Sequence, residues 1–368
     1  MSFRLLFSLA SLLLVGAPLS AQSITLPQES PAASVSQTIG ITEVRVSYHR
    51  PSVNQREVWG KLVPYGLNNL GFGPSTQAPW RAGANENTLF SCTDDIRVGG
   101  KPLAAGTYGL HMIVTESGVI TVIFSRQTTA WGSFFYEPAQ DALRVDVTWE
   151  DAPHQEQLAY RFDSVTRTSA VLALVWEKKR IPIPITVDTD PIVVANLKRE
   201  LQSSKGFQYQ AWVNAADFLL TRGLELPLAL VWAETAISGP FIGERNFTSL
   251  SIKAKVLDKL GRASEASGVM DEALKVGSVT DLHQYGRQMI AAGNKQRALS
   301  VFKLNAERHP DVWPVNYGLA RDYSANGDYP AALQALLKAQ KQVPPGDTLN
   351  PPAIAANIEK LKQGKDIN

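Results

Sequence analysis

The chain has 368 residues, which is enough for two or three domains with hydrophobic cores of their own. Hydrophobic residues make up 44% of the sequence and charged residues 19%, a balance that excludes a disordered protein. The formal net charge of +2 predicts neither the basic surface of a nucleic-acid-binding protein nor an acidic tail, so we expect no nucleic acid partner.

The first residues are typical of a secretory signal peptide. Arg4 supplies the positive charge, an apolar run extends from Leu5 to Val15, and small residues before Ala21 suit cleavage after that residue. We therefore expect residues 1–21 to be removed and the exported protein to lie in the periplasm or outside the cell. The apolar run is too short to span a membrane and no later stretch is long enough, so we expect no transmembrane segment.

Residues 22–33 are polar and contain prolines, which predicts a linker. Residues 34–188 then show short stretches of alternating apolar and polar residues between turn-forming residues. In the first stretch Val44, Val46 and Tyr48 alternate with polar residues, as in a half-buried strand. This pattern predicts an antiparallel β-sandwich domain over residues 34–188.

The later stretches predict further strands and one irregular segment. Residues 52–79 are irregular, with one short helical turn expected between Arg56 and Gly66. The segment Ile181–Ile185 alternates isoleucine with proline, which predicts an edge strand or an extended strap because proline lacks the N–H donor of a ladder. The other predicted strands are residues 88–92, 94–98, 106–115, 119–126, 142–149, 157–163 and 169–176.

The composition changes after Asp188, and residues 189–368 predict an α-helical domain that begins at Asp190-Pro191. An internal repeat lies near its end. Four residues recur 34 positions later: Gly293, Ala298, Phe302 and Pro310 return as Gly327, Ala332, Leu336 and Pro344. Weaker copies precede them: Ala254, Leu257, Gly261, Ala266 and Met270, and before those Ala216, Leu219, Gly223, Ala229 and Ala233.

This spacing has a structural meaning. Small residues allow two antiparallel helices to approach closely, glycine provides the turn between them, and proline ends the second helix. The pattern resembles a degenerate tetratricopeptide repeat (TPR) over Phe207–Pro344, which implies helical hairpins with a concave surface that docks a protein or peptide partner. The alternative interpretation is that a few helical pairs only brace the sandwich.

The segment Trp80–Thr88 is the candidate site. It places Trp80, Arg81, Asn85 and Glu86 around one glycine, on a loop that leads into the predicted strands. Tyr48, Arg50 and Arg56 precede it, and arginine forks suit a carboxylate or a phosphate. A pocket of these residues would bind a small anion, a sugar acid or a peptide terminus. Alternatively, the loop is a tight turn in which Glu86 pairs with one of the arginines.

Five stretches follow the pattern of a known family in order: Tyr48–Val53, Arg56, Leu62–Gly66, Trp80–Glu86 and Gly106–Tyr108. The region Ser30–Asp188 thereby resembles the bacterial domain of unknown function 2911 family. The resemblance implies a fold and a secreted location, but no established activity. The sequence departs from the family at Asn54-Gln55-Arg56, where Lys-Gly-Arg is common, and at Leu67–Pro79, an insertion that would lengthen a lid or alter access to the site.

An enzymatic alternative stays open. A hydrolase acting on an envelope or extracellular substrate would use Glu86 as acid/base, with Asp163 or Glu137 as its partner and Arg81 as electrostatic stabiliser. We expect no cofactor, because the sequence contains no nucleotide-binding motif.

We also expect no metal and no reactive thiol. The five histidines show no zinc-binding spacing, although His49, His111 and Glu86 form one conceivable ligand set. The single cysteine, Cys92, excludes an intramolecular disulfide and lies in an apolar run, as is typical of a buried thiol.

Overall fold

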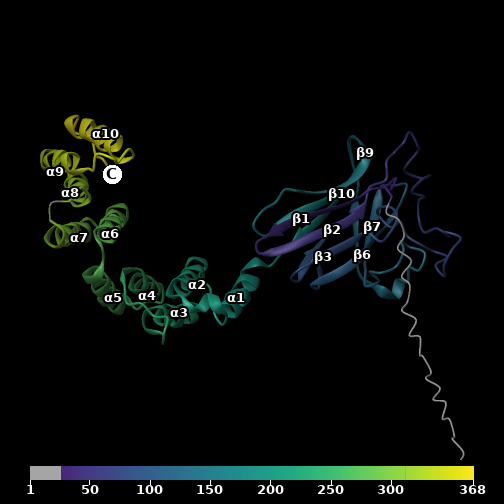
Figure 1. The fold of residues 1–368 in the computed structure, drawn as a ribbon, viewed down its shortest axis with the longest axis horizontal. Helices are drawn as coiled ribbons and strands as arrows, with labels where there is room; N and C mark the ends of the chain where they lie inside the picture. Colours follow the sequence, from purple (N-terminus) through teal and green to yellow (C-terminus); the bar gives the residue numbers. More distant parts are fainter. Residues whose placement is uncertain (1–25, 311) are drawn as a thin grey trace, which may run out of the picture. The chain divides into compact units, whose positions relative to one another are not determined.

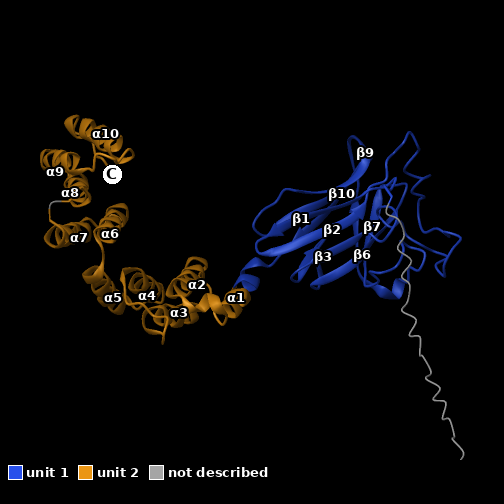
Figure 2. Cartoon of the chain, viewed as in Figure 1, with its two compact units in different colours: residues 1–193 blue, residues 194–368 orange. Residues whose placement is uncertain are grey.

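The computed structural model describes residues 26–310 and 312–368, so the predicted signal peptide lies outside the described residues. The chain divides into two compact units, residues 1–193 and 194–368 (Figure 1, Figure 2). The division falls inside helix α1 (Thr189–Glu200), slightly beyond the boundary predicted after Asp188. Thr189 is buried and its hydroxyl donates a hydrogen bond to the Arg167 carbonyl, which places the start of α1 in the first unit.

The first unit is an antiparallel β-sandwich, as the sequence predicts. Within the described residues one sheet has six strands in the order β1-β2-β3-β6-β7-β8, and the other has four in the order β5-β4-β10-β9. The strands are β1 (Ala32–Ile39), β2 (Thr42–His49), β3 (Leu89–Cys92), β4 (Ile96–Val98), β5 (Lys101–Leu103), β6 (Gly106–Val114), β7 (Val119–Ser125), β8 (Asp141–Thr148), β9 (Glu150–Asp163) and β10 (Ser169–Thr186). A short 3-10 helix, η1 (Pro138–Gln140), precedes β8.

The core lies between the two sheets and follows from the predicted alternation. Val44 and Val46 of β2 are fully buried, and Val46 pairs with Phe90 of β3. Phe90 packs edge-on against Phe124 of β7, with ring centroids 5.0 Å apart. Cys92 is buried in the same core, and burial raises the pKa of its thiol to about 11. The thiol therefore stays protonated near neutral pH and packs as a small apolar group.

The predicted linker ends earlier than residue 33. Ala32 and Ala33 already belong to β1 and pair with His49 and Tyr48 of β2. The sequence could not indicate this earlier start of β1, because strands pair through backbone N–H and C=O groups. Alanine carries these groups just as residues with high β-propensity do. The predicted helical turn between Arg56 and Gly66 is absent from the described structure, which has turns and an isolated bridge there instead.

The second sheet contains two strands that are longer than predicted. β9 begins at Glu150 rather than at residue 157, and β10 continues to Thr186 rather than ending at Trp176. Ion pairs hold the extension of the hairpin: Lys179 lies 2.6 Å from Asp151, and Arg180 lies 2.6 Å from Glu150. These contacts depend on cross-strand register, which a polar sequence without alternation does not reveal.

The isoleucine–proline segment is the end of β10 rather than a separate edge strand or strap. Pairing with β9 ends at Arg180, and pairing with β4 is confined to Ile185 and Thr186. Pro182 and Pro184 therefore lie where β10 has no ladder partner, so their missing N–H groups break no hydrogen bond.

The second unit consists of paired helices. The helices are α2 (Tyr209–Arg222), α3 (Leu226–Ser238), α4 (Phe247–Lys259), α5 (Ala263–Val276), α6 (Val279–Ala291), α7 (Lys295–Arg308), α8 (Trp313–Ala325), α9 (Tyr329–Gln342) and α10 (Asn350–Lys362), with a 3-10 helix η2 (Ser204–Phe207) ahead of them. The pairs α2–α3, α4–α5, α6–α7 and α8–α9 pack as hairpins, and α10 packs on α9. None of the described helices is long and apolar enough to cross a membrane.

The predicted repeat explains these hairpins. Gly223, Gly261, Gly293 and Gly327 each have a positive φ, between 66° and 80°, at the turn inside a pair. The repeated apolar residues are buried at the contacts between helices: Ala298, Phe302, Ala332 and Leu336 have no exposed surface. The TPR-like organisation expected from the spacing is therefore confirmed.

We predict that Gly327→Ala destabilises the helical unit by about 1–2 kcal/mol, because its φ of 80° is unfavourable for any residue with a Cβ atom. Urea unfolding followed by far-UV circular dichroism measures the change. Gly346→Ala is the matched control, because both glycines have open space around them and Gly346 is not among the glycines with positive φ. Equal effects of the two substitutions would contradict this explanation of the turn.

Candidate functional site

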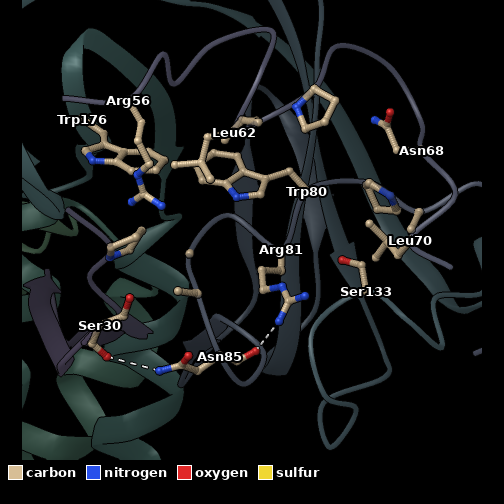
Figure 3. Close-up of a pocket in the computed structure, with 17 residues that line it drawn as sticks. Ser30, Arg56, Leu62, Asn68, Leu70, Trp80, Arg81, Asn85, Ser133 and Trp176 are labelled. Atoms are coloured by element: carbon tan, nitrogen blue, oxygen red, sulfur yellow. Dashed lines mark hydrogen bonds between the residues drawn. The ribbon is translucent and has the colours of Figure 1, made fainter. Parts of the chain in front are cut away.

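The first unit contains a cavity of about 350 Å³ beside the segment Trp80–Asn85 (Figure 3). This volume lies in the range of small-ligand pockets. The chemically distinctive lining residues are two arginines, two tryptophans and two asparagines, namely Arg56, Arg81, Trp80, Trp176, Asn68 and Asn85. The other lining residues are Ser30, Pro51, Leu62, Val63, Pro64, Leu70, Ala78, Pro79, Gly83, Ala84 and Ser133. This lining contains cations and amides but no acidic side chain.

Trp80 anchors the candidate loop to the sheet. Its backbone N–H and carbonyl both hydrogen-bond to Met112 of β6, each at 2.8 Å. The Trp80 ring stacks on Trp176, with centroids 6.0 Å apart and planes 17° apart, and meets the edge of Trp59 at 5.9 Å. Because backbone and ring are both fixed, the loop presents its next residues in one geometry.

The backbone after Arg81 is strained and is held by hydrogen bonds. Ala82 is buried with a φ of 51°, and its carbonyl accepts hydrogen bonds from the Tyr160 hydroxyl at 2.9 Å and the Thr88 hydroxyl at 3.2 Å. A Cβ atom on Gly83 would lie 2.5 Å from the Thr88 hydroxyl, so glycine is required there. The strain and its fixed partners are a feature of functional loops.

Asn85 closes the loop and has a structural role of its own. Its φ is 57°, and its side-chain amide donates to the Gln28 side chain at 3.1 Å. The same amide donates to the Ser30 carbonyl at 3.2 Å, as Figure 3 shows. Residues placed by the sequence in the linker thus help to build the site. The Asn85 side chain therefore fastens the loop to a distant part of the chain rather than to groups within its own turn.

Arg81 carries the most unusual electrostatic environment of the site. One guanidinium N–H donates to the Asn85 carbonyl at 2.6 Å (Figure 3), and the group lies over the Phe134 ring, 5.1 Å from its centroid. A Cβ atom on Gly132 would fall 2.3 Å from Arg81 Cζ, so this glycine allows the backbone to approach the guanidinium closely. Burial lowers the pKa of Arg81.

No carboxylate compensates this charge in the part of the chain that the structure describes. Arg81 makes no ion pair there, and its Nε and Nη2 atoms make no hydrogen bond. Arg56 is a second cation in the cavity wall without an ion pair among the described residues; its guanidinium donates to the Val53 carbonyl at 3.1 Å and the Ser52 carbonyl at 2.6 Å. The cavity therefore has two cations and no described counter-charge.

Three of the predicted site residues do not line the cavity. Tyr48 is buried, and its hydroxyl accepts a hydrogen bond from the Tyr160 N–H at 3.1 Å. Arg50 donates to the Leu158 carbonyl at 2.9 Å. Tyr48 supports the loop through Tyr160, which bonds the Ala82 carbonyl, while Arg56, Trp80, Arg81 and Asn85 are brought together at the cavity.

Glu86 is the third of these residues. One oxygen of its carboxylate lies 3.3 Å from His49 Nε2 without forming a hydrogen bond, and no arginine pairs with Glu86 among the described residues, contrary to the alternative interpretation. Neither Asp163 nor Glu137, its suggested acid/base partners, lines the cavity, and Asp163 pairs with Arg180 at 3.0 Å. The constellation required by a Glu86-dependent hydrolase is therefore not assembled at this cavity.

His111 and Ser133 form a polar pair that sequence reasoning missed. His111 Nδ1 lies 2.8 Å from the Ser133 hydroxyl, and both residues are buried. Burial, and then the nearby charge of Arg81, lowers the pKa of His111 to about 4. His111 thus stays neutral near neutral pH and adds no positive charge beside Arg81. The described residues contain no group of three or more His, Cys, Asp or Glu side chains placed to hold a metal, so His49, His111 and Glu86 do not form one.

The insertion Leu67–Pro79 forms part of the cavity wall. Asn68 and Ala78 pair with each other through two backbone hydrogen bonds, at 3.0 and 2.8 Å, and both line the cavity together with Leu70. The departure from the family pattern was the signal that could have identified these residues. Ser133 and Trp176 carry no such signal, because they lie far from the motif in the sequence.

The comparisons with known proteins agree with this division of the chain. Residues 30–185 match the family described as "Protein of unknown function (DUF2911)". This confirms the resemblance predicted for the first unit and assigns no activity to the DUF2911 domain. A search of curated proteins gives no match to the sequence.

Several solved structures are similar to part of this chain. They include the APC/C hetero-tetramer Cut9-Hcn1 (12% identity, TM-score 0.31), the TPR protein YrrB (19%, 0.29) and a thermophilic TPR protein of Thermus thermophilus (17%, 0.29). The matches cover 48%, 46% and 48% of this chain, and 33%, 83% and 91% of the other chains, respectively. This chain thus spans only about a third of the first of them. Because the TM-scores are near 0.3, these similarities support no conclusion, and the TPR-like description of the helical unit rests on its own hairpins.

We predict that the DUF2911 domain loses stability as the pH falls from 6.5 towards 4. The unfolded chain takes up a proton on His111 near the ordinary pKa of 6.5, whereas the folded chain takes it up only near pH 4. The lowered pKa corresponds to about 3 kcal/mol over this range. Hydrogen exchange of the β6 peptide Gly106–Val114, followed by mass spectrometry, measures the local stability.

His111→Gln should flatten this pH dependence, because glutamine keeps a hydrogen-bonding group and does not titrate. His154→Gln is the matched control, since His154 lies on the exposed face of β9 in the same domain. An unchanged slope in His111→Gln, or an equal change in His154→Gln, would show that the pH dependence arises elsewhere.

Proposed function

We propose that the DUF2911 domain is a binding domain for a small anionic ligand, held by Arg81 in the cavity beside Trp80. The observation that carries this proposal is the partly buried guanidinium of Arg81, which has no carboxylate partner among the described residues. A cation removed from water without a counter-charge is costly, and an anion in the cavity would supply one. Nε and Nη2 present an edge of two N–H groups, which matches two oxygens of a carboxylate or phosphate.

The lining favours binding over catalysis. The lining contains cationic, amide, aromatic and hydroxyl groups, whereas general acid/base chemistry needs a titratable group within reach of the ligand; His111 lies 2.8 Å from the hydroxyl of the lining residue Ser133 but does not itself line the cavity. Glu86 lies outside the lining and is paired with His49. We therefore place hydrolysis of an envelope or extracellular substrate second to ligand binding.

We predict that a small anion raises the melting temperature of the protein and that Arg81→Gln abolishes this effect. Acetate, inorganic phosphate and glucuronate are the probes, each with sodium chloride at the same ionic strength as reference. A ligand at a hundred times its dissociation constant adds roughly 2.7 kcal/mol of stability, which a thermal-shift assay detects.

Two matched variants complete this experiment. Arg97→Gln removes an exposed arginine of β4 whose guanidinium donates to the Gly100 carbonyl, and Glu86→Gln removes the carboxylate of the alternative mechanism. Both should keep the anion response of the unsubstituted protein. An anion response that persists in Arg81→Gln would refute the proposal. If no variant responds to any anion and Arg81→Gln has a much lower melting temperature, the role of the loop is structural only.

We infer a separate role for the helical unit, the docking of a peptide or protein partner. Its support is a cavity of about 520 Å³ between the hairpins α4–α5 and α6–α7, lined by polar side chains such as Lys255, Tyr285 and Arg297. A photocrosslinker at Ser267, which lines this cavity, should capture the partner, whereas one at the exposed Leu337 of α9 should not. Equal capture at both positions would argue against a site here.

We also infer that the protein is exported. The support is the charge, apolar run and small residues of positions 4–21. Mass spectrometry of the protein produced in a bacterium should find Gln22 as the first residue, whereas retention of Met1 in the cytoplasm would contradict export.

A further inference from the structure

Large apolar side chains gather on two loops beside the cavity. In the first unit, most of the exposed large apolar residues fall within residues 62–72 and 131–135, and the others are isolated: Leu26, Ile41, Val119 and Val165. The members of the two loops are Leu62, Tyr65, Leu67, Leu70, Phe72, Trp131 and Phe135. Phe72 is 65% exposed and Trp131 is 53% exposed. Their apolar surface is therefore in contact with water, and a bound ligand or protein could cover it.

The two loops are joined to each other. The Phe72 ring lies edge-on against Phe134 and Phe135, with centroids 5.5 and 5.9 Å apart. The Ser75 N–H donates to the Phe134 carbonyl at 3.2 Å. A Cβ atom on Gly73 would lie 2.3 Å from the same carbonyl oxygen, so the backbones are in close contact. We call Leu62, Leu70, Phe72 and Phe135 the apolar rim.

The apolar rim is continuous with the cationic cavity. Leu62 and Leu70 line the cavity and are also exposed. Phe134 connects the cationic cavity with the apolar rim, because its ring faces the Arg81 guanidinium and also contacts the Phe72 ring. A ligand whose charged end reaches Arg81 would therefore have apolar surface directly beside its remaining atoms.

We propose that the ligand of this site is a monomeric amphiphile, a carboxylate with an aliphatic tail. Its carboxylate occupies the free Nε–Nη2 edge of Arg81, and its tail passes Leu70 and covers Phe72 and Phe135. This inference rests on the proposed function and specifies the ligand class of the same site. It accounts for an apolar rim beside a cation, which a small hydrophilic anion would leave exposed.

The charge pattern of the loops favours a single amphiphile over a membrane surface. Residues 62–79 and 127–136 contain no Lys, Arg, Asp or Glu. Loops that bind anionic bilayers gain much of their affinity from lysine and arginine near the surface. Here the Arg81 charge is instead partly buried in the wall of a cavity of about 350 Å³.

Isothermal titration calorimetry of the full chain with dodecanoate, acetate and dodecan-1-ol tests the proposal. We expect dodecanoate to bind at least about tenfold tighter than acetate, because each buried methylene contributes about a fourfold gain in affinity. Dodecan-1-ol, which lacks the charge, should bind more weakly than dodecanoate. Far-UV circular dichroism at the same concentrations verifies that the protein stays folded.

Substitutions separate the head from the tail. Phe72→Ser and Leu70→Ser should weaken dodecanoate binding about fivefold or more and leave acetate binding unchanged, whereas Arg81→Gln should weaken both. Val165→Ser is the matched control, because Val165 is 44% exposed in the same unit but does not belong to either loop. It should change neither affinity.

The outcomes distinguish this inference from the proposed function. Acetate that binds as tightly as dodecanoate, or rim variants without effect, would overturn the amphiphile and leave the anion site intact. Equal affinity for dodecan-1-ol would overturn it as well. Binding to phosphatidylglycerol vesicles without binding to monomeric dodecanoate would assign the rim to a membrane. Absence of binding by every anion would refute the anion site itself.

Discussion

A cation that is partly removed from water needs compensation, and the Arg81 cation of the first unit has no carboxylate partner among the described residues. The Arg81 guanidinium has Phe134 and Gly132 against it, and the Asn85 carbonyl accepts one of its N–H groups. Neutral carbonyls and aromatic rings offset only part of the cost of burying a charge. The neutral state of His111 avoids an added repulsion. The remaining imbalance is what an anionic ligand would relieve.

The position of this cation depends on the core of the sandwich. The Ala82 carbonyl accepts from Tyr160, and the Tyr160 backbone in turn donates to the Tyr48 hydroxyl, while the two rings pack edge-on at 4.8 Å. Trp80, which precedes Arg81 in the sequence, is fixed by two backbone hydrogen bonds to Met112 of β6. The same residues thus hold the loop in place and position the residues of the proposed binding site.

Much of the fold could be predicted from local pattern, whereas the site could be predicted only in part. The strands were predictable from the alternation of residues such as Val44 and Val46, and the helical hairpins from the spacing of Gly293 and Gly327. Both patterns are periodic and can be read from residues close together in the sequence. The cavity wall instead combines residues that are distant in sequence: Ser133 lines the cavity although it lies far from the Trp80–Thr88 motif.

Neighbours in sequence can also diverge in space. Ala82 and Asn85 both adopt left-handed backbone conformations, with φ of 51° and 57°, so the direction of successive side chains does not follow from their order. Arg81 therefore lines the cavity while Glu86 turns to His49. Sequence proximity suggested that these two charges act together, and backbone conformation decides that they do not.

The most direct test of this account is the side-chain NMR signal of Arg81 during a titration with acetate. The protein would carry ¹⁵N-labelled arginine, with Arg81→Gln used to assign the Nε resonance. We predict a saturable shift of the Arg81 Nε–H signal, at acetate concentrations that leave exposed Arg97 unchanged. A shift of Arg81 that does not saturate and only follows that of Arg97 would reflect ionic strength alone, and would contradict the claim that this partly buried cation binds an anion.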